Sequence, residues 1–253
     1  MDHRTRIDIA HQVAEFLRRT HPAIIAIDVH GSTAKGEDRE HSDLEMGVLT
    51  RGPPDTDYYQ TIHRGIVIEA SFISVDDAVK EVTDVRQSWG FSVDGWTSYI
   101  AVFDPEAWFP RLAAMAANPP REKVIPAARA SITSTYEDLC KMRNFAASGE
   151  SAMVRFMAPH AAYGAACFLA LLNRQYFNGL RNLLAKPRDF KTLPPHFWDD
   201  FVPLVAVDSN ESDLLGHAER LYRECDDLLT DSGMGRPASA DLQGALAAGR
   251  VSR

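Results

Sequence analysis

The pattern of apolar and polar positions predicts both helices and strands in the first half of the chain. Between residues 4 and 19, Ile9, Val13, Phe16 and Leu17 recur at helical spacing, which predicts an amphipathic helix. Residues 23–29 form an apolar run rich in β-branched side chains, which predicts a buried strand. From residue 43 to residue 48, polar or small residues alternate with apolar ones, as in a strand with one buried face.

The character of the sequence changes near residue 120. Before it, residues 66–73 predict a third strand after a turn at residues 63–65, residues 75–85 predict a helix, and residues 99–103 predict a short strand. Beyond Asn118-Pro119-Pro120 almost only helices are predicted, over about residues 122–148, 154–184 and 212–230, while prolines interrupt residues 186–210. We therefore predict an α+β protein. It would have a mixed-sheet domain over residues 1–121 and a helical bundle domain over residues 122–253, with a mobile tail from about residue 231.

The composition is that of a soluble globular protein, with 45% hydrophobic and 25% charged residues. The 35 Asp and Glu residues outnumber the 27 Lys and Arg residues, which gives a formal net charge of −8. This balance argues against a nucleic-acid partner, because such a protein needs a basic surface to meet the phosphates. It suits a cationic substrate, which an acidic cleft would concentrate, although moderate acidity also serves solubility alone.

The sequence predicts neither a disulfide framework nor a membrane anchor. The three cysteines, Cys140, Cys167 and Cys225, are far apart and form no Cys-x-x-Cys pair. Residues 1–19 carry charges throughout, unlike a signal peptide. The most apolar stretch, residues 161–172, is too short to span a bilayer. We expect a cytoplasmic protein with no membrane association.

Two acidic residues at the start of the second predicted strand are the first candidates for chemistry. Asp43 and Glu45 are two residues apart, so on a strand their side chains project from the same face. Two neighbouring carboxylates repel each other unless a cation lies between them, and hard oxygen ligands of this kind suit Mg²⁺. An Asp-x-Glu pair alone is more often a solvated strand face.

A second group of candidates surrounds the preceding turn. Gly31 and Ser32 stand where a strand runs into a loop, and a glycine there lets the backbone and the Ser32 hydroxyl approach a triphosphate. Lys35 would add positive charge at the leaving pyrophosphate. Glu69 lies within an otherwise apolar strand, where an unpaired acid is costly to bury. A Gly-Ser pair alone usually marks an ordinary turn, but these features together favour a metal-dependent nucleotidyl-transfer site.

Gly31-Ser32 followed by Asp43-x-Glu45 resembles the signature of the DNA polymerase β-type nucleotidyltransferase superfamily. Within it, the chain resembles the aminoglycoside 4′-O-nucleotidyltransferases, the kanamycin nucleotidyltransferase group. The closer resemblance rests on residues 30–46, 67–72 and 136–144. It implies a mixed-sheet nucleotidyltransferase domain followed by a helical bundle, an Mg²⁺-dependent reaction with ATP or another nucleoside triphosphate, and a homodimer with a shared active site.

The resemblance also implies roles for residues of the first domain. Asp43 and Glu45 would hold Mg²⁺ and the nucleotide phosphates, and Glu69 would line the acceptor side, where it could serve either the metal or the acceptor. The Gly31-Ser32 turn and Lys35 would contact the triphosphate. Lys35 stands where a relative has arginine, so it keeps the charge but loses the planar bidentate fork.

In the second domain the resemblance singles out two residues of the first predicted helix. Glu137 matches the general base of the family, and Lys141 matches a nucleotide-phosphate contact. Their spacing of four residues is also that of an ordinary salt bridge on a helix surface, and from spacing alone this is the more common case.

The expected reaction is in-line attack of an acceptor hydroxyl on the α-phosphorus of the triphosphate, with release of pyrophosphate. The resemblance implies an aminoglycoside acceptor such as kanamycin or tobramycin, modified at the 4′-hydroxyl, with antibiotic resistance as the outcome. Two alternatives stay open. One is the same chemistry on another small molecule, a protein side chain or an RNA end, and the other is a non-catalytic binding or toxin–antitoxin module of the same fold.

Overall fold

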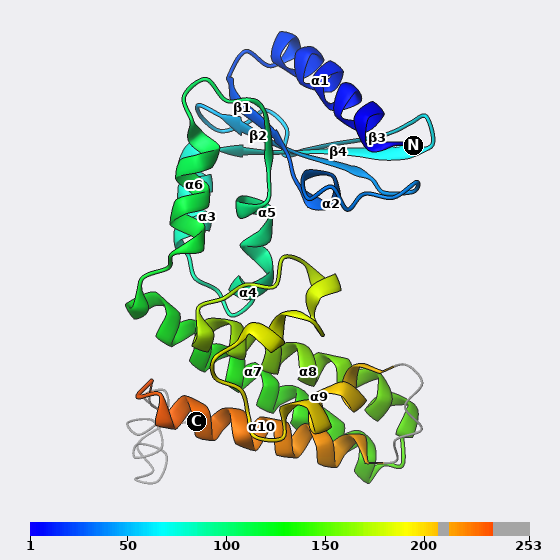
Figure 1. Cartoon of the computed structure of the whole chain (residues 1–253), viewed down its shortest axis with the longest axis vertical. Coiled ribbons are helices and arrows are strands. Elements are labelled where there is room, and N and C mark those ends of the chain that lie inside the picture. Colours follow the sequence, from blue (N-terminus) through cyan, green and yellow to red (C-terminus); the bar gives the residue numbers. More distant parts are fainter. Residues whose placement is uncertain (207–212, 235–253) are drawn as a thin grey trace, which may run out of the picture. The chain divides into compact units, whose positions relative to one another are not determined.

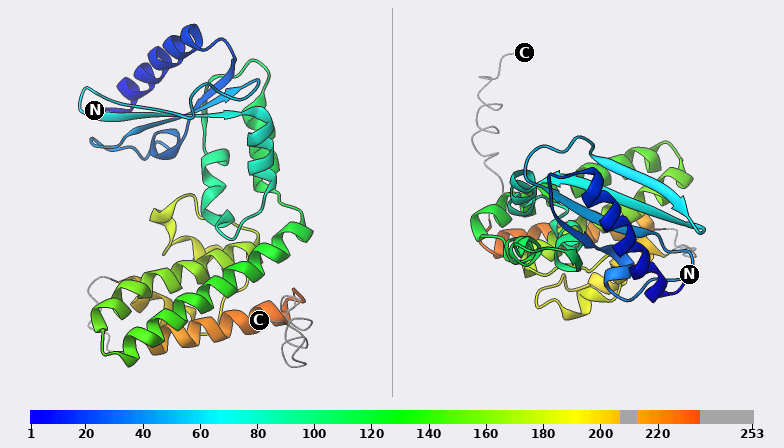
Figure 2. Two further views of the ribbon diagram at one scale, coloured as in Figure 1. Left: turned by 180° about the vertical axis from the view of Figure 1, so that it is seen from behind. Right: turned by 90° about the horizontal axis from the view of Figure 1, so that it is seen from above.

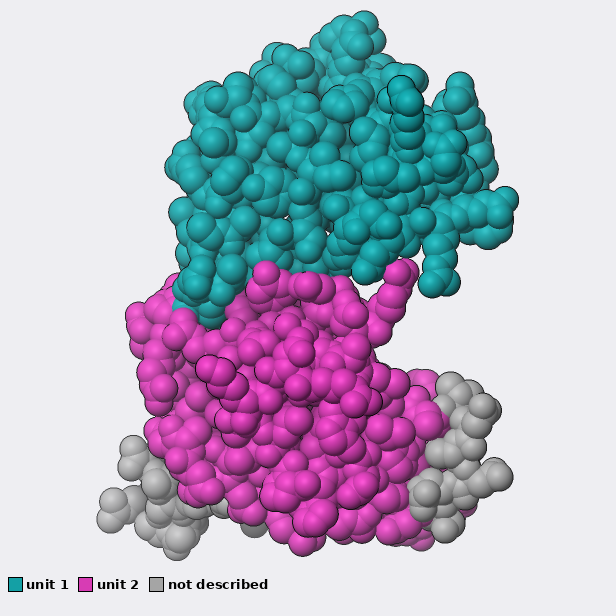
Figure 3. Space-filling view, viewed as in Figure 1, with its two compact units in different colours: residues 1–85, 92–119 teal, residues 86–91, 120–253 magenta. Residues whose placement is uncertain are grey.

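The computed structural model describes residues 1–206 and 213–234, which belong to two compact units (Figures 1 and 3). Unit 1 comprises residues 1–85 and 92–119, and unit 2 comprises residues 86–91 and the described residues from 120 onward. Unit 1 is built on a mixed β-sheet, whereas unit 2 is helical. The predicted α+β class is therefore confirmed.

Unit 1 contains a five-stranded sheet in the order β3-β4-β2-β1-β5. Its strands are β1 (Ile24–Val29), β2 (Leu44–Thr50), β3 (Tyr58–His63), β4 (Ile66–Ser74) and β5 (Ile100–Phe103). Strands β2 and β4 run parallel, and the other neighbouring pairs are antiparallel. The helices are α1 (His3–Thr20), α2 (Gly31–Ala34), α3 (Val75–Thr83), α5 (Asp94–Thr97) and α6 (Trp108–Ala117), while α4 (Trp89–Ser92) spans the return of the chain from unit 2 to unit 1.

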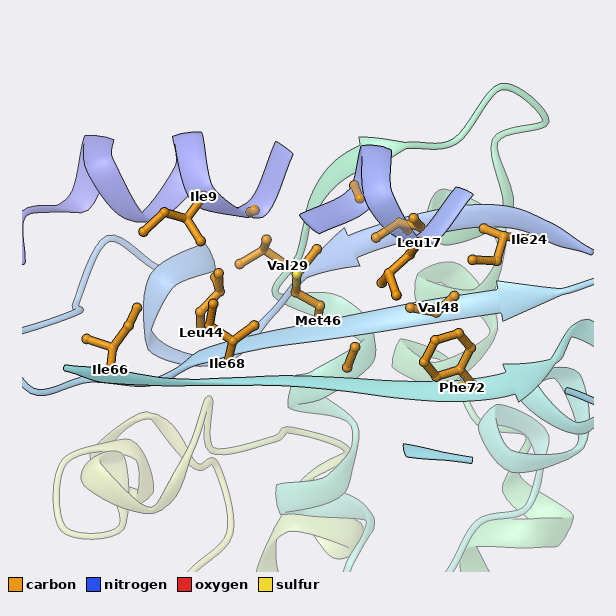
Figure 4. Packing of buried hydrophobic residues seen from close by; sticks show 14 residues of the cluster. Ile9, Leu17, Ile24, Val29, Leu44, Met46, Val48, Ile66, Ile68 and Phe72 are labelled. Atoms are coloured by element: carbon orange, nitrogen blue, oxygen red, sulfur yellow. The ribbon is translucent and has the colours of Figure 1, made fainter. Parts of the chain in front are cut away.

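Helix α1 covers one face of the sheet, as both views show (Figures 1 and 2). Ile9 and Leu17 of α1 belong to the same buried cluster as Val29 of β1 and Met46 of β2 (Figure 4). Burial alternates along the first half of β2, whose apolar residues lie in this core while Glu45 is only half-buried. The packing of α1 therefore fixes which face of β2 carries the acidic side chains.

The sequence pattern missed β3 and α6. Strand β3 is almost entirely exposed, so it lacks the alternation of a half-buried strand. It pairs with β4 through the two-residue turn Arg64-Gly65, whose φ angles of 50° and 81° match a tight hairpin. Helix α6 starts at a loop in which the Asp104 carboxylate accepts the amides of Trp108 and Phe109, at 2.8 and 2.9 Å. This capping acid lies four residues before the helix, where sequence rules do not look for it.

A buried arginine fixes the loop that leads into β2. Arg6 of α1 is 0% exposed, and its guanidinium donates to the Asp38 carboxylate and to the carbonyl oxygens of Arg39 and Ser42, the latter two at 2.8 and 3.1 Å. Burial alone would raise the pKa of Asp38, but hydrogen bonds from His3 and Arg6 lower it below its usual value. Since Ser42 directly precedes Asp43, the same contacts hold the start of the acidic strand.

Unit 2 is a helical bundle formed by α7 (Arg121–Ala147), α8 (Ser151–Asn173), α9 (Phe197–Val205) and α10 (Leu214–Asp231), with the short 3₁₀ helices η1 (Leu180–Asn182) and η2 (Lys186–Asp189). Helices α7 and α8 pack closely, and a Cβ on Gly164 would lie 2.4 Å from the Thr135 hydroxyl. Residues 86–91 join this unit through Phe91, which stacks on Phe177 with ring centroids 4.3 Å apart.

Two predictions for the helical half were wrong in detail. The helix predicted to reach residue 184 ends at Asn173, because Arg174 adopts a left-handed conformation with φ of 52°. Residues 197–205 form α9 although Pro203 lies inside it, where a proline is unfavourable. Burial of Phe197, Phe201 and Leu204 offsets that cost. The predicted start of the last helix at residue 212 lies outside the described residues, as does the predicted mobile tail beyond residue 234.

Helix α8 is both long and apolar. With 23 residues it is long and apolar enough to cross a membrane, unlike the shorter apolar stretch considered from sequence. However, 61% of its apolar window is buried within the structure, as in the core helix of a soluble protein. Its hydrophobicity is thus accounted for by packing inside unit 2.

We predict that Asp38→Asn destabilises the protein by about 3 kcal/mol, because it leaves the Arg6 charge buried without its partner. Chemical denaturation followed by circular dichroism measures the free energy of unfolding. The control is Glu15→Gln, which removes an exposed ion pair of the same helix and should change stability by less than about 1 kcal/mol. Equal effects of the two substitutions would contradict the anchoring role of Arg6.

Candidate active site

Three carboxylates meet on the face of the sheet opposite α1. Asp43 directly precedes β2, Glu45 lies on β2, and Glu69 lies on β4 at the register position paired with Glu45. Each is half-buried, and each offers a carboxylate oxygen within 4.8 Å of the oxygens offered by the other two. The parallel pairing of β2 and β4 thus brings together the acids that sequence analysis singled out in unit 1.

The neighbouring charges of this cluster affect the pKa of Glu45. Its pKa is raised, first by burial and then by the neighbouring carboxylates of Asp43 and Glu69. His30 and Lys35 act in the opposite direction, because their positive charges favour the ionised form. The cluster is therefore a place where added positive charge is stabilising.

Gly31 leaves the space that the Glu45 carboxylate occupies. It adopts a φ of 66°, and a Cβ at this position would lie 1.7 Å from Glu45 Oε2. The preceding amide, that of His30, donates to the Glu45 carbonyl oxygen at 3.0 Å. The turn after β1 therefore lies directly against Glu45, and only glycine satisfies both the backbone conformation and the space.

Ser32 and Lys35 lie on and just after the same turn. Ser32 is partly exposed in α2. The Lys35 ammonium pairs with the Asp94 carboxylate, which also accepts from the Ser98 hydroxyl at 2.9 Å. The sequence did not single out Asp94, which lies 59 residues further along the chain. Lys35 is thus held near the carboxylate cluster by a partner that local spacing cannot predict.

A buried acid beside the site also escaped sequence analysis. Asp28 on β1 is 3% exposed, and its Oδ1 accepts the Gly47 amide at 2.8 Å and lies 3.5 Å from His30 Nδ1. Burial raises the pKa of Asp28. Burial would lower the pKa of His30, but the nearby acids, Asp28 foremost, raise it. An acid within an apolar strand was the signal used for Glu69, and the same signal applies to Asp28.

Two side chains of β3 contact Glu69 from the edge of the sheet. Gln60 Nε2 donates to Glu69 Oε1 at 2.6 Å. A hydrogen bond with Glu69 raises the pKa of the Tyr58 phenol. Because β3 itself was not predicted, these neighbours of Glu69 could not be found from sequence.

The structure places Glu137 and Lys141 in unit 2, on the exposed surface of α7. Lys141 Nζ lies 3.1 Å from Glu137 Oε1 and 3.2 Å from Asp138 Oδ1, and the Glu137 side chain is 70% exposed. Hydrogen bonds to Glu137 and Asp138 raise the pKa of Lys141. Within unit 2 the two residues form the surface ion pair that their spacing indicates.

The donor set of the carboxylate cluster fits a divalent cation. Three hard oxygen donors converge from two adjacent strands, the usual chemistry of an Mg²⁺ site that keeps positions for water and phosphate. Among the residues that the structure describes, this is the one group of three acidic, histidine or cysteine side chains with such spacing. We therefore regard it as the candidate metal site.

A solved structure shares the fold of this chain. A solved structure of a nucleotidyltransferase-like protein from Exiguobacterium sibiricum 255-15 matches this chain with a TM-score of 0.56 and 13% sequence identity, over 89% of this chain and 75% of that chain. This likeness shows the fold. No curated protein matches the chain significantly.

A protein-family model described as the KNTase C-terminal domain matches residues 106–234, just over half of the 253 residues. The matched region contains all the described helices of unit 2 from α7 onward, so the family is identified by the half of the protein that lies outside the carboxylate cluster. The family match and the likeness of fold together support nucleotidyl transfer. The chain belongs to the family of proteins with a KNTase C-terminal domain, within the nucleotidyltransferase superfamily.

Proposed function

We propose that this protein is an Mg²⁺-dependent transferase that moves AMP, or another nucleoside monophosphate, from a nucleoside triphosphate to an aminoglycoside hydroxyl. The observation that carries the proposal is the convergence of Asp43, Glu45 and Glu69, whose oxygens lie within 4.8 Å of one another. Three like charges at this spacing are favourable only with a cation among them.

The proposed chemistry is an in-line displacement at the α-phosphorus. Asp43 and Glu45 would hold Mg²⁺, which when bound neutralises charge on the phosphate oxygens, and Glu69 would stand on the acceptor side of the same cluster. The Ser32 hydroxyl and the adjoining amides would donate to phosphate oxygens. Lys35 would stabilise the charge of the departing pyrophosphate, and its pairing with Asp94 keeps its ammonium near this position in the absence of substrate.

The acceptor is proposed from the family and from charge. The KNTase C-terminal domain model matches residues 106–234, which include unit 2 from α7 to α10. The chain has a net charge of −8, which suits a polycationic amino sugar. We propose kanamycin or tobramycin as substrate, the 4′-hydroxyl as the site of modification, and antibiotic resistance as the result. The reacting hydroxyl needs a general base, because an alcohol is a weak nucleophile.

We propose Glu137 as this base and Lys141 as a phosphate contact. The exposed carboxylate of Glu137 is accessible to a substrate, and Lys141 supplies a cation 3.1 Å away. By resemblance, the working form would be a homodimer in which Glu137 of one protomer meets the carboxylate cluster of its partner. Asp138 contacts the same lysine at 3.2 Å but has no proposed role, so it provides a matched comparison.

The product test is mass spectrometry of kanamycin after incubation with the protein, ATP and Mg²⁺. We expect a mass increase of one AMP, together with pyrophosphate release that depends on kanamycin and is abolished by EDTA. No adduct with kanamycin or tobramycin, but adduct formation on another acceptor, would contradict the aminoglycoside assignment. No pyrophosphate release with any acceptor would favour a non-catalytic module of the same fold.

For the base, we predict that Glu137→Gln lowers kcat by about 10²- to 10⁴-fold, because the acceptor hydroxyl loses its proton acceptor. The fold should be retained, since the side chain is exposed. Asp138→Asn, which alters the neighbouring contact of Lys141, should keep kcat within about threefold. The measurement is the steady-state kcat of both variants. A kcat of Glu137→Gln close to that of the wild type would contradict the assignment of Glu137 as general base.

A further inference from the structure

A cavity opens within unit 1 on the same face of the sheet as the carboxylate cluster. Its volume is about 370 Å³, within the range of small-molecule sites. Gly47 and Ser71 line it, and each lies two residues beyond a cluster acid, Glu45 on β2 and Glu69 on β4. Since residues two apart on a strand share a face, the cavity adjoins the carboxylate cluster along these strands.

The lining of this cavity is largely apolar, and its charged side chains are two acids and one histidine. Asp28 lines it from the buried side, and the exposed Glu81 of α3 lines it from the solvent side. Trp96 of α5 stands beside Glu81 and donates from Nε1 to Glu81 Oε1 at 3.3 Å. His30 is the basic side chain of the lining, and it lies against Asp28.

Gly47 allows the buried carboxyl group of Asp28 to sit at the cavity wall. A Cβ on Gly47 would lie 2.4 Å from Asp28 Oδ1, so any larger residue would displace the carboxyl group. The Gly47 amide instead donates to the same oxygen at 2.8 Å. Gly47 thus leaves space at the cavity wall for the Asp28 carboxyl group. This acid is costly to bury, and it does not belong to the apolar core beneath α1.

The chemistry of the lining selects one class of ligand. An anion would face two acids against one histidine. A purely apolar ligand would cover the exposed carboxylate of Glu81 without replacing its contacts with water. An ammonium group offers three donors to carboxylates and is attracted by the face of an indole ring. A cationic amine therefore suits the two acids of the cavity, and the lining hydroxyls of Ser71 and Ser92 can also accept hydrogen bonds from it.

We propose that this cavity binds an ammonium group of a small organic cation, with Glu81 and Trp96 at the entrance and Asp28 at the inner wall. In terms of the proposed function, on which this part rests, it is a subsite that holds an amino group of the acceptor. The acceptor hydroxyl would then lie towards the carboxylate cluster. This assigns a binding role to residues that take no part in the metal site.

Binding of kanamycin in the absence of nucleotide and Mg²⁺ tests the proposal, measured by isothermal titration calorimetry. We expect Glu81→Gln and Asp28→Asn each to weaken the affinity by about tenfold or more, because each removes a charged hydrogen-bond partner. Asp76→Asn, which alters an exposed acid of the same helix outside the cavity, is the matched control and should bind as wild type does. Maltotriose, an uncharged trisaccharide, should not bind detectably.

Glu81 is exposed, so its substitution leaves folding intact even if Asp28→Asn disturbs the core. Wild-type affinity of Glu81→Gln for kanamycin, or equal binding of maltotriose, would overturn the proposal. The proposed function can fail separately. Kanamycin binding that depends on Glu81 without any AMP adduct would reject the transfer reaction and support the cavity, whereas adduct formation with an unchanged KM in both variants would support the reaction and reject the cavity.

Discussion

The mutual repulsion of three carboxylates, imposed by the parallel pairing of β2 and β4, is the constraint on which the rest of the site depends. Glu45 and Glu69 occupy paired register positions, and Asp43 enters the same face at the start of β2. The backbone cannot separate these residues without losing its register, because a shift of one residue would turn the acids into the core. The fold thus keeps an unfavourable interaction that a divalent cation would relieve. Burial first, and then the charges of Asp43 and Glu69, raise the pKa of Glu45.

Other parts of unit 1 hold this arrangement in place. The buried Arg6 fixes the loop before Asp43 through carbonyl contacts and the Asp38 carboxylate. Gly31 lets the turn after β1 approach Glu45 more closely than any side chain would permit. The apolar face of β2 is packed beneath α1, which leaves the acidic face free for the site. Stability and function are therefore divided between the two faces of one sheet.

The sequence was informative where burial imposes a period, and uninformative where contacts are made between distant segments. Alternation along β2 was sufficient to place Asp43 and Glu45 on one face. The position of Glu69 beside Glu45 could not be derived, because it depends on strand pairing across the intervening hairpin. Strand β3 is exposed and gave no burial pattern, and the partnership of Lys35 with Asp94 joins residues 59 positions apart. Asp28 could have been identified from sequence in the same way as Glu69, because both acids lie within otherwise apolar strands.

The most direct measurement of the central claim is divalent cation binding, followed by electron paramagnetic resonance of Mn²⁺ in the presence of a non-hydrolysable ATP analogue. The account predicts that wild-type protein binds Mn²⁺ and that Mg²⁺ displaces it. Glu45→Gln should weaken the affinity by at least about tenfold, because it removes a ligand and part of the charge that attracts the ion. Asp55→Asn, an exposed acid of the same unit, should bind as wild type does. Equal Mn²⁺ affinity of the wild-type and Glu45→Gln proteins would contradict the account.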